Sequence, residues 1–94
     1  MSDTKILLVD DHAVVRMGFK MLIEAEPDMT VIAEAESGEL GIKAFKEFKP
    51  DIVIMDITMP GIGGIEAIDR ICAHDKSAKI LVLSAHEDSV HPTM

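Results

Sequence analysis

The residues best placed to do chemistry in this chain are three aspartates that follow two short apolar runs. Asp10 and Asp11 come directly after the run 5–9, and Asp56 ends the run 51–56. Short apolar, β-prone runs are typical of buried strands, and the Pro/Gly-rich stretch after Asp56 cannot continue as helix or sheet. We therefore expect two buried strands that each end in carboxylates.

Carboxylates at the ends of neighbouring strands would converge on one edge of a sheet. Ionised carboxylates repel one another at short range and need a cation nearby, and hard oxygen ligands favour Mg²⁺. Asp56 could then act as a nucleophile that accepts a phosphoryl group. Ser84, after a later strand, is placed to hydrogen-bond a phosphoryl oxygen, and Thr58 could offer its backbone carbonyl to the metal. We expect His12 at a helix start or on the surface rather than among the ligands.

The elements that position these residues follow from the hydrophobic periodicity. It predicts strands over 5–9, 29–35, 51–56 and 79–83, and helices over 13–25, 37–49 and 65–74. A further helix is expected to begin within 87–94. Strands that alternate with helices favour an α/β fold with a doubly wound parallel sheet, covered on both faces, whose ligands bind at the carboxyl ends of the strands.

The helical spacing also predicts which side chains enter the core. The last strand, 79–83, is expected to be buried, and 29–35 to alternate Val31 and Ala33 against Thr30 and Ile32. The methionines at 17, 21 and 29 are interpreted as core residues. The predicted apolar faces of the three helices comprise Val15, Phe19, Leu22 and Ile23; Leu40, Ile42, Ala44, Phe45 and Phe48; and Ile65, Ile68, Ile71 and Cys72.

Composition excludes several classes of partner and location. The 94 residues carry a formal net charge of −8, which argues against nucleic acid or an anionic membrane as the direct partner of this segment. A lone cysteine favours a reducing cytosol, and we recognise no signal peptide. No apolar run approaches the length of a membrane span. We expect one soluble, cytoplasmic domain.

At this point the residues carry a resemblance. The set Asp10-Asp11, Asp56 with Met59-Pro60 and Gly64, and Ser84-Ala85 resembles the receiver domain of two-component response regulators. The runs 8–12, 16–18 and 31–35 are similar to the NarL/FixJ-like subfamily.

The resemblance implies a flavodoxin-like fold with strand order 2-1-3-4. It implies that Asp56 is the phosphoacceptor for a sensor histidine kinase, in an intact protein that controls transcription through a helix-turn-helix domain. It further implies that Ser84 is the switch hydroxyl and that Mg²⁺ is held by Asp10, Asp11, Asp56 and the Thr58 carbonyl.

The resemblance also defines what is expected to be missing. A receiver of this family continues through a fourth helix, a fifth strand with a phosphoryl-contacting lysine, and a fifth helix. We therefore expect residues 1–94 to form an incomplete receiver domain that lacks the last strand and helix and the DNA-binding domain. The strand 79–83 would then expose a long apolar edge, through which we expect a homodimer or larger assembly.

Two other functions compete with the phosphoacceptor hypothesis. One is a receiver-like module that is not phosphorylated and acts through protein contacts alone. The other is a phosphohydrolase that works through an aspartyl phosphate; this class needs a general acid two residues after the nucleophile, where this chain has Thr58. We expect a phosphoacceptor rather than an enzyme.

Overall fold

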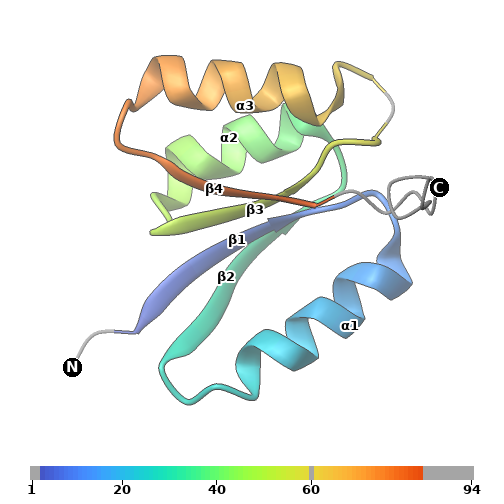
Figure 1. The fold of residues 1–94 in the computed structure, drawn as a ribbon, viewed down its shortest axis with the longest axis vertical. Coiled ribbons are helices and arrows are strands. Elements are labelled where there is room, and N and C mark those ends of the chain that lie inside the picture. The colour runs from blue at the N-terminus through green and yellow to red at the C-terminus, as the bar shows by residue number, and fades with distance from the viewer. Residues whose placement is uncertain (1–2, 60, 84–94) are drawn as a thin grey trace, which may run out of the picture.

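The computed structural model describes residues 3–59 and 61–83, and all seven predicted elements in these ranges are present (Figure 1). The last helix begins at Gly63 rather than at Ile65. Ser84 and the predicted helix start within 87–94 lie outside the described residues. In chain order the elements are β1 (Thr4–Val9), α1 (Ala13–Glu24), β2 (Met29–Ala35), α2 (Gly38–Phe48), β3 (Ile52–Asp56), α3 (Gly63–His74) and β4 (Lys79–Leu83).

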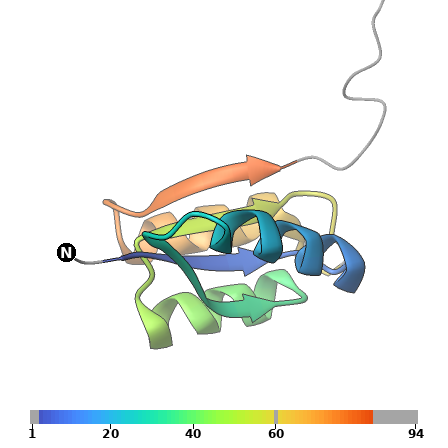
Figure 2. The same cartoon turned by 90° about the horizontal axis from the view of Figure 1, so that it is seen from below.

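The four strands form one parallel sheet in the order β2-β1-β3-β4, which confirms the predicted fold class and strand order. Figure 2 shows β4 and β2 at opposite edges of the sheet, with β1 between them. Helix α1 covers one face, and α2 and α3 cover the other (Figure 1). The two central strands, β1 and β3, are therefore the ones that the core encloses from both sides.

Alternate residues of the central strands supply the two halves of the core. Because successive side chains of a strand point to opposite faces, β1 contributes Leu7 and Val9 to one cluster and Ile6 and Leu8 to the other. The first cluster packs under α2 and α3 through Phe45, Ala67 and Ile71, among other side chains. Strand segments buried on both faces must be apolar, as β1 is over residues 6–9 and β3 over residues 53–55.

Strand β2 departs from the simple alternation that we predicted. The pairing between β1 and β2 shifts between Ile6, which lies opposite Val31, and Leu7, which lies opposite Ala33. Ile32 is thus left without a counterpart on β1. As a result Val31 packs in the α1-side cluster and Ala33 against the opposite one, so the prediction that these two side chains share a face was wrong.

Several residues predicted for the helical core are exposed instead. On α1 only Phe19 and Ile23, one turn apart, pack against the sheet cluster, whereas Leu22 is 71% exposed. The stripe that faces the sheet is narrower than the predicted one, and most of the buried residues on α2 and α3 are Gly or Ala. Side chains predicted as core but found exposed are Met17, Met21, Leu22, Leu40, Phe48 and Ile65.

Strand β4 was predicted to be buried and is not. Leu81 and Val82 are 55% and 47% exposed, because no element that the structure describes lies beyond β4 in the sheet. The expectation that residues 79–83 form an apolar edge therefore holds for the described part of the chain. None of the helices described here combines the length and apolar character needed to cross a bilayer.

Helix α2 has a side-chain cap at its N-terminus and a left-handed residue at its C-terminus, whereas α1 has neither. The hydroxyl of Ser37 accepts a hydrogen bond from the Leu40 backbone N–H at 3.1 Å, which caps α2. The helix ends at Phe48, and the left-handed backbone of the C-cap residue Lys49 (φ 50°) redirects the chain before Pro50. His12 is the N-cap residue of α1, as predicted, but its side chain makes no capping hydrogen bond.

Candidate functional site

The carboxyl ends of β1 and β3 place two aspartates side by side in the protein interior. Asp56 is the last residue of β3, and Asp10 follows β1 directly, where its backbone N–H donates to the Ala35 carbonyl of β2 at 3.0 Å. Asp10 is 1% exposed and Asp56 is fully buried. Ionised side chains are rarely buried to this degree unless they are paired or bind an ion, so both residues require an explanation.

The Asp56 carboxylate is held on one side only. Its Oδ1 accepts hydrogen bonds from the Thr58 backbone N–H at 2.9 Å and from the Thr58 hydroxyl at 2.7 Å. Its Oδ2 is buried, and within residues 3–59 and 61–83 it has no hydrogen-bond partner. Thr58 therefore orients the carboxylate through its side chain, a role that the sequence did not indicate. The predicted role of the Thr58 carbonyl stays a prediction.

Asp10 is fixed from both its side chain and its backbone. The carboxylate Oδ1 accepts a hydrogen bond from the His12 backbone N–H at 2.7 Å. The Asp10 carbonyl accepts from Arg16 Nη1 at 2.6 Å, and the Arg16 Nε donates to Glu34 Oε1 at 3.1 Å. Arg16 thus ties the loop after β1 to strand β2. Its sequence position, five residues after Asp11, signals a helix surface residue and does not reveal this contact.

The structure brings Asp10, Asp11 and Asp56 together as predicted, and it adds His12. One potential ligand atom from each of the four residues can be chosen so that all lie within 4.8 Å of one another. The His12 Nδ1 is 3.1 Å from Asp10 Oδ1 and 3.0 Å from Asp11 Oδ1, but only the Asp10 contact has hydrogen-bond geometry. The prediction that His12 lies at a helix start was correct; its proximity to the carboxylates was not foreseen.

This pocket fits a hard divalent cation. In the part of the chain described here, Asp56 Oδ2 and Asp11 Oδ1 are buried without a hydrogen-bond partner. Nor does any Lys or Arg side chain among these residues form an ion pair with the three aspartates. The desolvation penalty of an uncompensated buried charge is several kcal/mol, which makes bare carboxylates costly here. Three carboxylates, two of which have an oxygen without a hydrogen-bond partner, supply the ligand type that Mg²⁺ prefers.

Gly64 holds the start of α3 against the backbone that carries Asp56. A Cβ on Gly64 would lie 2.4 Å from the Asp56 carbonyl oxygen and 2.5 Å from the Ile57 Cα. Only glycine allows this approach without a shift of the backbone. The glycine in the predicted motif therefore serves to pack α3 against the loop of the site, rather than to adopt an unusual backbone conformation.

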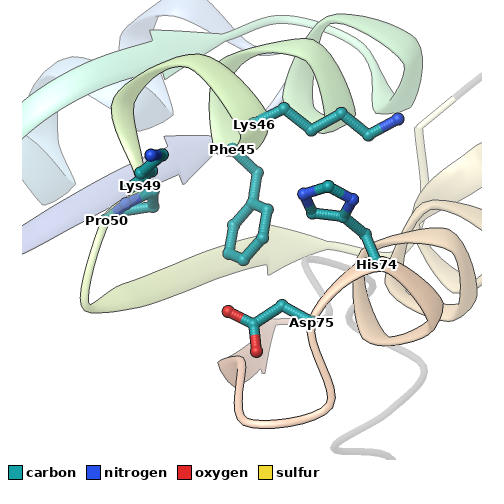
Figure 3. Close-up of a pocket in the computed structure, with 6 residues that line it drawn as sticks. All are labelled: Phe45, Lys46, Lys49, Pro50, His74 and Asp75. Atoms are coloured by element: carbon teal, nitrogen blue, oxygen red, sulfur yellow. The ribbon is translucent and has the colours of Figure 1, made fainter.

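A separate pocket lies at the opposite end of the sheet, away from the aspartates. It has a volume of about 260 Å³ and is lined by Phe45, Lys46, Lys49, Pro50, His74 and Asp75 (Figure 3). The rings of Phe45 and His74 meet edge to face, with centroids 6.2 Å apart. The Ser77 hydroxyl, and then its backbone N–H, donate to Asp75 at 2.7 and 2.9 Å and lower the pKa of that carboxyl. None of the predicted site residues lines this pocket.

Comparison with known proteins identifies the family. The sequence model of one protein family, the response regulator receiver domain, matches residues 6–93 of this chain. The chain belongs to this family. It is 42% identical over 92 residues to the transcriptional regulatory protein LiaR of Bacillus subtilis, covering 96% of this chain and 44% of that protein. It is 42% identical over 87 residues to the nitrate/nitrite response regulator protein NarL of Escherichia coli, covering 90% of this chain and 40% of NarL.

A solved structure agrees with the sequence relatives. A two-component response regulator of the LuxR family from Aurantimonas superposes with a TM-score of 0.87 at 45% identity, over 92% of this chain and 61% of that one. These relatives confirm the predicted NarL-like subfamily of response regulators. The chain spans about two fifths of the length of the curated relatives that it matches.

Proposed function

We propose that this receiver accepts a phosphoryl group from a sensor histidine kinase onto Asp56, with Mg²⁺ in the adjacent acid pocket. The observation that carries the proposal is the asymmetry of the Asp56 carboxylate: Thr58 holds Oδ1, while Oδ2 is buried without a partner among the described residues. An oriented carboxylate with one free oxygen is a competent nucleophile for phosphoryl transfer.

The transfer would proceed by in-line displacement at phosphorus. The Asp56 carboxylate attacks the phosphorus of the kinase's phosphohistidine, a P–O bond forms, and the P–N bond breaks as the imidazole leaves with the electron pair. Asp10, Asp11, Asp56 and the Thr58 carbonyl would hold Mg²⁺, whose positive charge would offset the carboxylates and the phosphoryl oxygens. Ser84, outside the described residues, is the proposed switch hydroxyl that contacts the phosphoryl group.

A structural neighbour supports the metal assignment. CheY of Borrelia burgdorferi, solved as a complex with CheX, BeF₃⁻ and Mg²⁺, superposes with a TM-score of 0.79 at 31% identity over 95% of this chain and 69% of that one. We infer from this likeness, and from the free carboxylate oxygens of the pocket, that the metal of this chain is also Mg²⁺. The chain would be a phosphoacceptor and not a turnover enzyme.

The kinase must dock where its phosphohistidine can reach Asp56. Helix α1 begins two residues after Asp11 and exposes Val14, Met17 and Met21, which are 80%, 62% and 69% exposed. Contiguous apolar side chains on a surface mark protein contacts. We assign this side of α1 to the kinase. A Met17→Glu variant should then lose phosphotransfer from the kinase while it still accepts phosphate from a small acyl phosphate.

Two further assignments complete the proposal. By likeness to its relatives, the receiver would act in the cytoplasm and control a helix-turn-helix DNA-binding domain elsewhere in the intact protein. The receiver itself would not contact the DNA, because its net charge of −8 disfavours binding to nucleic acid. The 94-residue chain would also associate with itself through the exposed edge of β4, since unpaired strand edges template pairing. Light scattering at high protein concentration tests the second assignment; a monodisperse monomer contradicts it.

The decisive experiment is intact mass spectrometry after incubation with Mg²⁺ and a small acyl phosphate. We expect one phosphoryl adduct that requires Mg²⁺ and disappears in Asp56→Asn. The matched control is Asp69→Asn, which removes an exposed carboxylate on α3 and should leave the adduct unchanged. If no adduct forms, the same test on a chain that continues past Met94 decides the matter. An unmodified longer chain would replace this proposal with the protein-interaction module.

A further inference from the structure

The side chain of His12 lies beside the acid pocket, and the proposed mechanism does not use it. It follows Asp11 at the start of α1 and is 56% exposed, so it is open to solvent on one side and faces the aspartates on the other. Its Nδ1 lies 3.1 Å from Asp10 Oδ1 and 3.0 Å from Asp11 Oδ1. The side chain makes no capping hydrogen bond to the helix backbone, and its Nδ1 is hydrogen-bonded to the Asp10 carboxylate instead.

We propose that His12 gives the acid pocket a nitrogen ligand, so that the site binds Zn²⁺ and similar borderline cations through imidazole as well as carboxylates. The inference rests on the proposed function, because it concerns the same pocket that is assigned to Mg²⁺. Imidazole suits Zn²⁺, whereas Mg²⁺ takes oxygen ligands and water. His12 would then set the metal preference of the site without taking part in Mg²⁺ binding.

The spacing of the ligand atoms supports this coordination. In a four-coordinate zinc site with ligand bonds of roughly 2.0–2.2 Å, neighbouring ligand atoms lie roughly 3.4 Å apart. The distances from His12 Nδ1 to the Asp10 and Asp11 oxygens, 3.1 and 3.0 Å, are close to this value. All four ligand atoms lie within 4.8 Å of one another, so the set would have to contract slightly around the ion.

An independent observation points to a ligand in the same place. Asp56 is fully buried, and its Oδ2 has no hydrogen-bond partner among residues 3–59 and 61–83. A bound cation would satisfy this oxygen and the equally unpartnered Asp11 Oδ1. The cluster therefore offers two free carboxylate oxygens beside one imidazole nitrogen, which is a mixed oxygen and nitrogen donor set rather than an all-oxygen one.

The test is isothermal titration calorimetry of the whole chain with ZnCl₂ and, separately, with MgCl₂, both at neutral pH. The variants are His12→Ala, Asp56→Asn and the control His74→Gln, which alters an exposed histidine on α3. All are repeated in a background with His86→Gln and His91→Gln, so that other imidazoles cannot hold the zinc. Visible absorption of the Co²⁺-loaded chain reports directly on the ligand set.

We expect His12→Ala to weaken Zn²⁺ binding by at least about tenfold, since loss of even an indirect partner of a metal costs this much. Mg²⁺ affinity should change by less than about twofold, because Mg²⁺ takes carboxylate oxygens and water as ligands and does not use the imidazole. His74→Gln should change neither. If His12→Ala leaves Zn²⁺ affinity and the Co²⁺ spectrum unaltered while Mg²⁺ still binds in an Asp56-dependent manner, the role of His12 is refuted and the proposed function stands. If Mg²⁺ binding does not depend on Asp56, the proposed function itself fails.

Discussion

The contact between Gly64 and the backbone after Asp56 makes a sharp prediction about Gly64→Ala. The new methyl carbon would lie 2.4 Å from the Asp56 carbonyl oxygen and 2.5 Å from the Ile57 Cα. Both are backbone atoms, so no side-chain rotation can relieve the overlap. Helix propensity works in the opposite direction, because alanine is favoured over glycine in a helix by about 1 kcal/mol.

Comparison of the two magnitudes decides the sign. Overpacking a well-packed site costs typically about 1–3 kcal/mol, and here the displaced atoms belong to the chain that carries the site. We expect Gly64→Ala to lower the free energy of unfolding by about 2 kcal/mol. It should also weaken Mg²⁺ binding, because any shift that relieves the overlap moves the backbone at Asp56.

Gly18→Ala is the matched control for this prediction. Gly18 also lies in a helix, α1, but a Cβ there would meet no atom within 4 Å. Only the propensity effect remains, so this variant should be more stable than the wild type by up to about 1 kcal/mol. Urea unfolding followed by far-ultraviolet circular dichroism is the assay, since the chain has neither Trp nor Tyr. A Gly64→Ala protein as stable as Gly18→Ala would show that α3 does not press on the Asp56 loop as described.

Five further substitutions test the packing, the capping and the surface electrostatics. Leu7→Ala, at a fully buried position, should lower the free energy of unfolding by about 2–5 kcal/mol. Its control is Leu22→Ala, at a position that is 71% exposed, which should change the free energy of unfolding by less than about 0.5 kcal/mol. Equal urea midpoints for the two variants would contradict the burial assignment. Ser37→Ala removes the cap of α2 and should cost about 1 kcal/mol in the same assay, while Ser37→Asp should retain most of the stability. Ser77→Ala should raise the pKa of Asp75, because the hydrogen bonds from Ser77 hold that pKa below its ordinary value of 3.8 in the folded protein. A carboxyl group whose pKa is lowered by folding stabilises the fold at pH values above its unfolded-state pKa. The stability difference between the variant and the wild type should therefore be present at neutral pH and vanish as the pH falls through the folded-state pKa. An NMR titration of Asp75 that is the same in both proteins would refute the role of Ser77.

The sequence was a reliable guide wherever local chemistry decides the outcome. The order of strands and helices follows from periodicity, and Ser37 starts α2 because a hydroxyl can accept a backbone hydrogen bond at that point. The convergence of Asp10, Asp11 and Asp56 could be predicted as well, because the carboxyl ends of parallel strands meet at one edge of the sheet.

Burial on the helices was the least predictable property. Met17, Met21 and Leu22 have the apolar character of core residues, and yet they lie on the side of α1 that faces away from the sheet. Periodicity identifies an apolar stripe but not its width, which depends on how closely a helix approaches the sheet. The same holds for β4, whose apolar run is typical of a central strand although the described sheet ends there.

By itself, then, the sequence determined the α/β architecture and the three aspartates of the site, because strand pattern and strand-end carboxylates are local features. Only the tertiary structure decided how these carboxylates are held: Thr58 on one oxygen of Asp56, Arg16 on the Asp10 carbonyl, and His12 within reach of both Asp10 and Asp11. It likewise decided the shift of β2 at Ile32. The physical reason is that side-chain contacts between elements depend on register and approach distance, which the packing of the whole domain sets.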